Sequence, residues 1–337
     1  MSETSANPKP YGHIGVIGGG AWGTALAIAA ARAGRRVTLW ARDADVVKAI
    51  NTDRENAKFL PGMLLPAEIA ATGTLIEVST ADAVLLVVPA QHVRAMLSEL
   101  QGHLQGSVPV AICAKGIERR TGRLMSEVAA ESLPREQIGI LSGPSFARDV
   151  ANGLPTAVTL AASAETGQRL QLSLGHGTFR PYASEDVIGV ALGGAAKNVY
   201  AIACGIVQGM GLGESARAAL VARSFAELRR LGEALGARRQ TLMGLSGLGD
   251  LVLTATSSTS RNFDFGIAIG KGNTRAELDA RGHPLAEGVE TAPALVARAH
   301  QDGVELPVAE TTAAILDGTL SLDAAIPRLM SRPLKAE

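Results

Sequence analysis

The chain of 337 residues is poor in aromatic side chains and in net charge. Phe, Trp and Tyr together make up 3% of the residues, too few for the aromatic platforms that stack on single-stranded nucleic acid. Lys plus Arg and Asp plus Glu are equal at 32 each, so no net charge attracts the chain to a nucleic acid or to an anionic membrane. We therefore expect no nucleic-acid partner, and any anion site must be built locally.

Cysteine is also scarce, and uninterrupted apolar runs are short. Cys113 and Cys204 lie in apolar segments without metal-ligand spacing, so we expect two reduced, buried thiols and no metal site. The most apolar segment, 187–211, is divided by Lys197 and Asn198 into runs shorter than the roughly 18 residues of a membrane span. We predict a central helix of a cytoplasmic protein with no membrane insertion.

The chain is long enough for two domains, and its pattern changes once. Residues 13–184 alternate short β-branched runs with helical segments, which is typical of a doubly wound parallel sheet covered on both faces. Residues 185–337 repeat apolar positions at helical spacing, so the second domain should be all-helical. Residues 1–12 are predicted to form a flexible tail. The expected strands are 13–17, 37–40, 84–88, 108–114, 138–141, 157–160 and 178–182.

Three glycines follow the first expected strand in the pattern G-x-G-x-x-G. Gly18 permits a tight turn, Gly20 leaves bare backbone for a diphosphate, and Gly23 lets the next helix pack closely on the strand. The helix N-terminus then adds free N–H groups and a partial positive charge. A purely structural glycine turn is the alternative, but the strand-helix-strand context favours a Rossmann-type dinucleotide-binding domain.

The residues after the second expected strand bear on the choice of dinucleotide. Arg42 would suit the 2′-phosphate of NADP, whereas Asp43, with a shifted register, would accept the ribose 2′-hydroxyl of NAD. We favour NADP; the alternative is that Arg42 is an ordinary solvated side chain.

Further candidate site residues either follow an expected strand or lie within the expected apolar helix. Lys115 directly follows one strand, and Gly143, Ser145 and Ala147 follow another, at the edge where such sheets bind ligands; Lys115 is equally compatible with a surface position. Lys197 is surrounded by apolar residues, an environment that lowers the pKa of lysine toward the range of a general acid or base.

Asp250, in a glycine-framed turn, is the expected countercharge for Lys197; a structural ion pair without chemistry is the alternative. Ser260, Arg261 and Asn262 are consecutive phosphate-grade donors in an expected polar loop, which could also be simply solvated. Together with the lysines, these donors would complete a pocket for a small phosphorylated substrate.

With these residues assembled, the chain resembles the bacterial NAD(P)-dependent glycerol-3-phosphate dehydrogenases over about residues 13–330. The resemblance rests on the segments GGGAWGTALA, LWARD, AKGIERRTGRL, SGPSFARDVANGLPTAV, GVALGGAAKNVYAIACGI, GLSGLGDLVLTATSSTSRN and AEGVETA. It implies reversible reduction of dihydroxyacetone phosphate to sn-glycerol 3-phosphate with NADPH or NADH, which supplies glycerophospholipid synthesis. It also implies a helical domain like that of 6-phosphogluconate dehydrogenase, and homodimers in many members.

The same resemblance implies roles for individual residues. Lys197 would be the catalytic proton donor or acceptor. Substrate contacts would be Lys115, Gly143, Ser145, Lys197, Asp250, Ser260, Arg261 and Asn262. Cofactor contacts would be Ala21, Trp22, Arg42, Lys115, Ala147, Arg261, Leu285 and Glu287, beside the three glycines.

Two positions depart from the family pattern, and two alternative functions stay open. Asp264 stands where a basic residue is common, and Leu285 stands where valine is usual. One alternative is a sister β-hydroxyacid or 6-phosphogluconate-type dehydrogenase. The other is a dinucleotide sensor without turnover.

Overall fold

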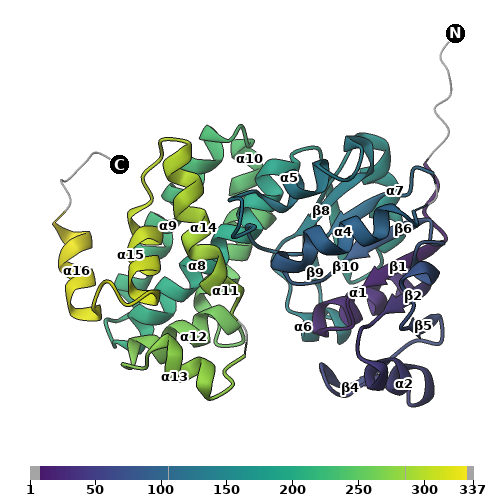
Figure 1. Cartoon of the computed structure of the whole chain (residues 1–337), viewed down its shortest axis with the longest axis horizontal. Coiled ribbons are helices and arrows are strands. Elements are labelled where there is room, and N and C mark those ends of the chain that lie inside the picture. The colour runs from purple at the N-terminus through teal and green to yellow at the C-terminus, as the bar shows by residue number, and fades with distance from the viewer. Residues whose placement is uncertain (1–7, 105, 285, 332–337) are drawn as a thin grey trace, which may run out of the picture. The chain divides into compact units, whose positions relative to one another are not determined.

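The computed structural model describes residues 8–104, 106–284 and 286–331, and these form two compact units (Figure 1). Unit 1 contains the described residues up to Ala114 together with Met125–Val190. Unit 2 contains Lys115–Leu124 and the described residues from Ala191 onward. A ten-residue segment within the first half of the chain, hereafter the 115–124 segment, thus belongs to unit 2, which differs from the predicted single boundary near residue 184.

Unit 1 is built on an eight-stranded sheet with the strand order β10-β9-β8-β7-β6-β1-β2-β5. All neighbouring pairs are parallel except β8 with β9, which are antiparallel. The strands are β1 (His13–Ile17), β2 (Arg36–Trp40), β5 (Ile69–Thr72), β6 (Ala83–Leu86), β7 (Val110–Ile112), β8 (Ile138–Ser142), β9 (Thr156–Ala161) and β10 (Phe179–Ser184).

All the predicted strands are present in this sheet. The sheet differs from the prediction in an additional edge strand, in the length of one strand and in the direction of one strand pairing. The expectation of a fully parallel sheet is wrong at β8 and β9. The expected strand at 108–114 is limited to the three residues of β7. β5 was not expected, because Ala70 and Ala71 carry little of the β-branched signal that marks a strand. A separate hairpin of β3 (Glu55–Asn56) and β4 (Leu60–Leu64) was also missed.

Helices cover both faces of the sheet, as predicted. Ile14 and Val16 of β1 and Leu85 of β6 belong to a core shared with helices, whereas Val84 and Leu86, which point to the opposite face, are equally buried. The helices of unit 1 are α1 (Ala21–Arg32), α2 (Ala44–Thr52), α3 (Leu75–Val78), α4 (Val93–Gln101), α5 (Met125–Ala130), α6 (Ala147–Ala151) and α7 (Ala164–Leu174).

The predicted flexible tail over residues 1–12 needs a correction at Tyr11. The ring of Tyr11 is buried, its backbone N–H donates to Ser173 Oγ at 2.8 Å, and the Arg169 guanidinium lies 4.0 Å from the ring centroid. This aromatic side chain provides an apolar surface that the composition-based expectation ignored. Residues 1–7 lie outside the described residues.

Unit 2 is helical, as predicted, around one long apolar helix. α8 is long and apolar enough to cross a membrane by length and composition, but most of it is buried inside the protein, as in a core helix. The helices are α8 (Val187–Gly209), α9 (Glu214–Ala234), α10 (Arg239–Met243), α11 (Asp250–Thr256), α12 (Arg261–Gly270), α13 (Arg275–Ala280), α14 (Glu287–Gln301), α15 (Pro307–Leu316) and α16 (Leu322–Met330).

Glycines on α8 allow its neighbours to approach closely. A Cβ on Gly193 would lie 2.5 Å from Ser246 O, in the π-helical turn that precedes α11. A Cβ on Gly205 would lie 2.1 Å from Phe263 O on α12. These contacts fix the N-terminal ends of α11 and α12 against α8, and both ends carry candidate site residues.

Candidate active site

The glycine loop of unit 1 has the geometry that a diphosphate requires. Gly18 has a φ of +128°, and a Cβ there would lie 2.3 Å from Val87 O. A Cβ on Gly23 would lie 1.8 Å from Gly18 O. Apart from its chain neighbours, no heavy atom of the described residues lies within 4 Å of a Cβ on Gly20. The backbone of Gly20 is therefore open to a ligand, and the residues present fit a dinucleotide.

The first turn of α1 leaves its N–H groups available. α1 begins at Ala21, and no described side chain caps it or adds an acidic group to its first turn. Trp22 packs against the core of unit 1, and its buried Nε1–H has no hydrogen-bond partner among the described residues. Ala21 and Trp22 thus directly follow the open backbone of Gly20, and their contacts with a cofactor stay a prediction.

At the end of β2, Arg42 and Asp43 differ in availability. Arg42 is exposed, and its side chain makes no hydrogen bond or ion pair with another residue of the described ranges. Asp43 caps α2, because its Oδ1 accepts the Asp45 N–H at 3.0 Å, and its Oδ2 lies 2.6 Å from Lys58 Nζ. The guanidinium is available to an anion, whereas both carboxylate oxygens have partners.

Gly143, Ser145 and Ala147 follow the carboxyl end of β8, as predicted. Gly143 has a φ of +148°, and a Cβ there would lie 2.8 Å from Val158 Cα, so this position requires glycine. Ser145 Oγ donates to Gly143 O at 3.0 Å, and Ala147 is the first residue of α6. Their contacts with substrate or cofactor stay predictions.

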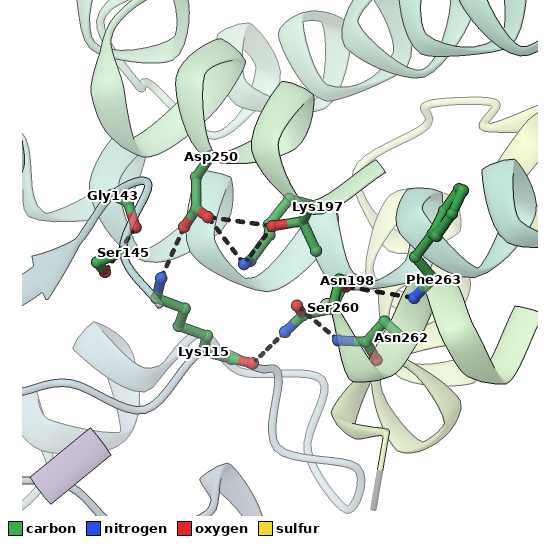
Figure 2. A network of polar contacts seen from close by, with 10 residues as sticks. Lys115, Gly143, Ser145, Lys197, Asn198, Asp250, Ser260, Asn262 and Phe263 are labelled. Atoms are coloured by element: carbon green, nitrogen blue, oxygen red, sulfur yellow. Dashed lines mark hydrogen bonds and ion pairs between the residues drawn. The ribbon is translucent and has the colours of Figure 1, made fainter. Parts of the chain in front are cut away.

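In unit 2, two lysines bind one buried carboxylate (Figure 2). Lys197 Nζ on α8 donates to Asp250 Oδ1 at 2.8 Å, which confirms the predicted pairing. Lys115 Nζ donates to Asp250 Oδ2 at 2.7 Å, and its side chain is only 13% exposed, so the surface alternative for Lys115 is wrong. Lys115, Lys197 and Asp250 thus form a cluster, here called the lysine pair and its carboxylate.

The helices explain why these groups meet. Asp250 begins α11 after the π-helical turn, rather than lying in a turn as expected, because Leu251 and Thr254 are buried on one helical face. Thr254 was missed by the sequence analysis; it lies four residues after Asp250 on the same face and accepts from Lys197 Nζ at 2.7 Å. The Asp-x-x-x-Thr spacing was the available signal.

The electrostatics of the cluster tune Lys197. Burial lowers the pKa of Lys197 to about 8, with the attraction of Asp250 opposing and the repulsion of Lys115 adding to that shift. Burial alone would raise the pKa of Asp250, but the two ammonium groups hold it below its usual value. Lys197 can therefore exchange a proton near neutral pH while Asp250 remains ionised.

A chain of amides links four segments of unit 2, and Figure 2 shows its part from Lys115 through Asn198 to Asn262. Gly288 N–H donates to Asn262 Oδ1 at 2.9 Å, Asn262 Nδ2 donates to Asn198 Oδ1 at 2.9 Å, and Asn198 Nδ2 donates to Lys115 O at 3.0 Å. Asn198 was not a predicted site residue, although a polar side chain beside Lys197 in an apolar helix could have signalled it. The amide chain fixes the backbone at Lys115.

The Ser-Arg-Asn run begins a helix, so the expectation of a polar loop is wrong. Ser260 caps α12 by accepting the Phe263 N–H on Oγ at 3.3 Å, and Arg261 and Asn262 form the first turn. Phe263 and Phe265 are buried, which fixes the face that α12 turns inward. Arg261 is exposed. The run therefore combines side-chain donors with the free N–H groups of a helix N-terminus.

Three residues singled out in the sequence remain: Glu287, Asp264 and Leu285. Glu287 begins α14, is partly buried, and its charge raises the pKa of Lys197 slightly. Asp264, the departure from the family pattern, is 54% exposed with Oδ2 at 3.3 Å from His283 Nε2. Leu285 lies outside the described residues. The negative charge of Asp264 is thus directed to a histidine of its own unit.

Comparison with known proteins gives one consistent answer. Residues 13–168 match the family model for the NAD-dependent glycerol-3-phosphate dehydrogenase N-terminus, and residues 186–327 match that for the C-terminus. A glycerol-3-phosphate dehydrogenase [NAD(P)+] of Bradyrhizobium sp. (strain ORS 278) is 58% identical over 325 residues, covering 96% of this chain and 98% of the relative.

Other relatives agree. The enzyme of the same name from Parvibaculum lavamentivorans is 53% identical over 328 residues, 97% of this chain and 98% of its own length. The crystal structure of glycerol-3-phosphate dehydrogenase from Coxiella burnetii superposes with a TM-score of 0.90 at 35% identity, covering 96% of this chain and 99% of that one. The chain belongs to the NAD-dependent glycerol-3-phosphate dehydrogenase family.

Proposed function

We propose that this chain catalyses the reversible NAD(P)-dependent reduction of dihydroxyacetone phosphate to sn-glycerol 3-phosphate. The observation that carries the proposal is Lys197, a buried ammonium held by Asp250 and Thr254 with a pKa of about 8. A general acid or base for carbonyl and alcohol chemistry needs a pKa near the operating pH. Family membership disfavours the sister β-hydroxyacid and 6-phosphogluconate-type alternatives.

In this proposal, Lys197 moves the proton. The reduced nicotinamide supplies a hydride to C2 of the ketone when it is bound. Negative charge then develops on the carbonyl oxygen, Lys197 Nζ gives that oxygen its proton, and the lysine regains a proton from solvent. The second ammonium, on Lys115, stabilises the developing charge, and Asp250 keeps Lys197 oriented. In the oxidation direction, neutral Lys197 removes the hydroxyl proton.

The N-terminus of α12 is proposed to bind the phosphate. Ser260 Oγ already accepts the Phe263 N–H, so its own hydroxyl proton remains to be donated. Arg261 adds a guanidinium, and the first-turn N–H groups add the partial positive charge of a ten-residue helix. Asn262 is held in place by the amide chain and retains a second Nδ2–H.

Unit 1 is proposed to bind the dinucleotide. Gly18, Gly20 and Gly23 would receive the diphosphate, with Ala21, Trp22 and Ala147 beside it and Glu287 of unit 2 as a further contact. NADP is favoured, because Arg42 is available whereas Asp43 is engaged by Asp45 and Lys58. A cytoplasmic location, a supply role in glycerophospholipid synthesis and a homodimer remain predictions of the family resemblance.

The test is an assay with purified protein. Loss of reduced-nicotinamide absorbance on adding dihydroxyacetone phosphate supports the proposal, provided that 3-hydroxy acids and 6-phosphogluconate produce no gain of that absorbance when they are added with the oxidised cofactor. Lys197→Met should reduce kcat by about 10²–10⁴-fold while changing the KM for dihydroxyacetone phosphate much less. Binding of the dinucleotide without turnover by the unmodified protein would instead favour a sensor, and a fully active Lys197→Met enzyme would refute the role of Lys197.

A further inference from the structure

The β3–β4 hairpin of unit 1 is attached to the glycine loop. Asn56 is 1% exposed, and its Nδ2 donates to Gly19 O and to Thr24 Oγ1, both at 2.8 Å. Gly19 also meets the end of β2, because a Cβ on Gly19 would lie 2.5 Å from Ala41 Cβ. The hairpin, the glycine loop and the residues after β2 therefore come together within unit 1.

Lys58 lies in the turn of this hairpin and pairs with Asp43, the residue after Arg42. Its Nζ lies 2.6 Å from Asp43 Oδ2, and its side chain is 59% exposed. The contact lowers the pKa of Asp43 through the hydrogen bond from Lys58 and raises the pKa of Lys58 in return. Asp43 Oδ1 is occupied by capping α2. Both charges of this pair are present at neutral pH, and Asp43 directly follows the exposed Arg42 in the sequence.

We propose that Lys58 determines cofactor choice by engaging Asp43, so that the end of β2 accepts a 2′-phosphate rather than a free ribose 2′-hydroxyl. This inference rests on the proposed binding of a dinucleotide to unit 1. An unpaired carboxylate at the end of the second strand accepts the ribose hydroxyl of NAD and repels the roughly −1.5 to −2 charge of a phosphate group. The Lys58 ammonium removes both effects and leaves Arg42 to bind the phosphate.

Binding of 2′,5′-ADP and 5′-AMP to the full chain, measured by calorimetry in phosphate-free buffer, tests the proposal, because these ligands differ only in the 2′-phosphate. Lys58→Met should weaken 2′,5′-ADP binding about two- to fivefold relative to 5′-AMP, the range expected for one screened surface charge. The kcat/KM ratio for NADPH over NADH should fall by a similar factor. Lys48→Met removes an exposed lysine of the same unit that is not paired with Asp43, and it should leave the ratio unchanged.

The Asp43→Asn background decides whether Lys58 acts through Asp43. Asparagine can still cap α2, so the helix start is preserved. In this background Lys58→Met should change the 2′,5′-ADP to 5′-AMP ratio less than twofold. An equal loss in both backgrounds would mean that Lys58 contacts the phosphate directly, and no loss in either would mean that it has no part; each result overturns the inference. Failure of the unmodified protein to bind either nucleotide would overturn the proposed function itself.

Discussion

Lys115 and Lys197 hold the two oxygens of a single buried carboxylate, with Nζ to oxygen distances to Asp250 of 2.7 Å and 2.8 Å. Two ammonium groups and one carboxylate leave this cluster with one net positive charge. A buried cluster with net positive charge favours an anion or a developing oxyanion next to it. The two neighbours of Lys197 also act on its pKa in opposite directions.

The first prediction concerns the pH dependence of ketone reduction. Lys197 must be protonated to act as the acid, so kcat/KM should be level at low pH and fall as the pH rises through about 8. Lys115→Met removes a repulsive charge, so the fall should move to higher pH. Asp250→Asn removes the attractive charge, so the fall in kcat/KM should move to lower pH. Initial rates measured from about pH 5.5 to about pH 10 for the unmodified enzyme and the two variants check these three profiles.

Opposite shifts in these two variants distinguish proton transfer by Lys197 from a structural role. Arg119→Met is a suitable control, since Arg119 lies on the same 115–124 segment but pairs with Glu290. Its profile should coincide with that of the unmodified enzyme. Identical profiles in all variants would contradict the assignment of the titrating group.

The second prediction concerns Asn198. Asn198→Ala removes the donor to Lys115 O and the acceptor for Asn262, so two groups lose their partner in a buried setting. We expect the free energy of unfolding to fall by about 1–3 kcal/mol and kcat to fall as well. Asn273→Ala provides the matched comparison, because Asn273 Nδ2 donates to Ala268 O at 2.8 Å away from the cluster. It should lower stability without lowering kcat, and equal kcat losses in both variants would argue against a positioning role for Asn198.

The third prediction concerns the contact between α8 and α12. Gly205→Ala would place a Cβ 2.1 Å from Phe263 O, so α12 must shift. We expect a loss of about 1–3 kcal/mol in the free energy of unfolding and a raised KM for dihydroxyacetone phosphate. Gly102→Ala should change neither quantity appreciably, because apart from chain neighbours no heavy atom in the described part of the chain lies within 4 Å of the new Cβ. An unchanged KM in a destabilised Gly205→Ala protein would show that α12 does not set phosphate binding.

The fourth prediction concerns Glu227, a buried carboxylate that accepts the Val308 N–H at 2.7 Å and the Ala309 N–H at 3.2 Å. Burial raises its pKa to about 7, although these N–H groups and Arg230 oppose the shift. The folded state thus holds a proton that the unfolded state loses near pH 4.5. Stability should therefore be full below about pH 4.5 and decline as the pH rises to about 7.

Glu227→Gln removes this titration. Denaturant unfolding at pH 5 and pH 8 should show a loss of about 2–4 kcal/mol in the unmodified protein relative to the Gln variant. The same pH dependence in both proteins would exclude Glu227 as its source.

Local patterns were sufficient for much of the fold and for single site residues. The glycine motif has a fixed spacing within one strand-turn-helix unit, and Lys197 stands out because its neighbours on the same helix are apolar. The helix start at Ser260 was missed, because a run of polar residues predicts a cap and a loop equally well. The antiparallel direction of β9 depends on chain path, which residue type does not encode.

Contacts between distant segments were the main gap. Lys115 and Asp250 are 135 positions apart, and no pattern in either segment identifies the other as its partner. The amide chain through Asn198 and Asn262 joins four segments and is equally invisible to local periodicity. Asp250 could be paired with Lys197 because a buried cation needs a countercharge, but not with two cations at once.

Because of the 115–124 segment, the polypeptide passes from one unit to the other three times, after Ala114, after Leu124 and after Val190. A gene truncated after codon 184 would encode a fragment that still carries Lys115 but not Asp250 or Asn198. The complementary fragment would keep Lys197 and Asp250 and lack the second ammonium. The two halves are therefore not separable modules, and shuffling the first half onto another helical half would also transplant the lysine that pairs with Asp250.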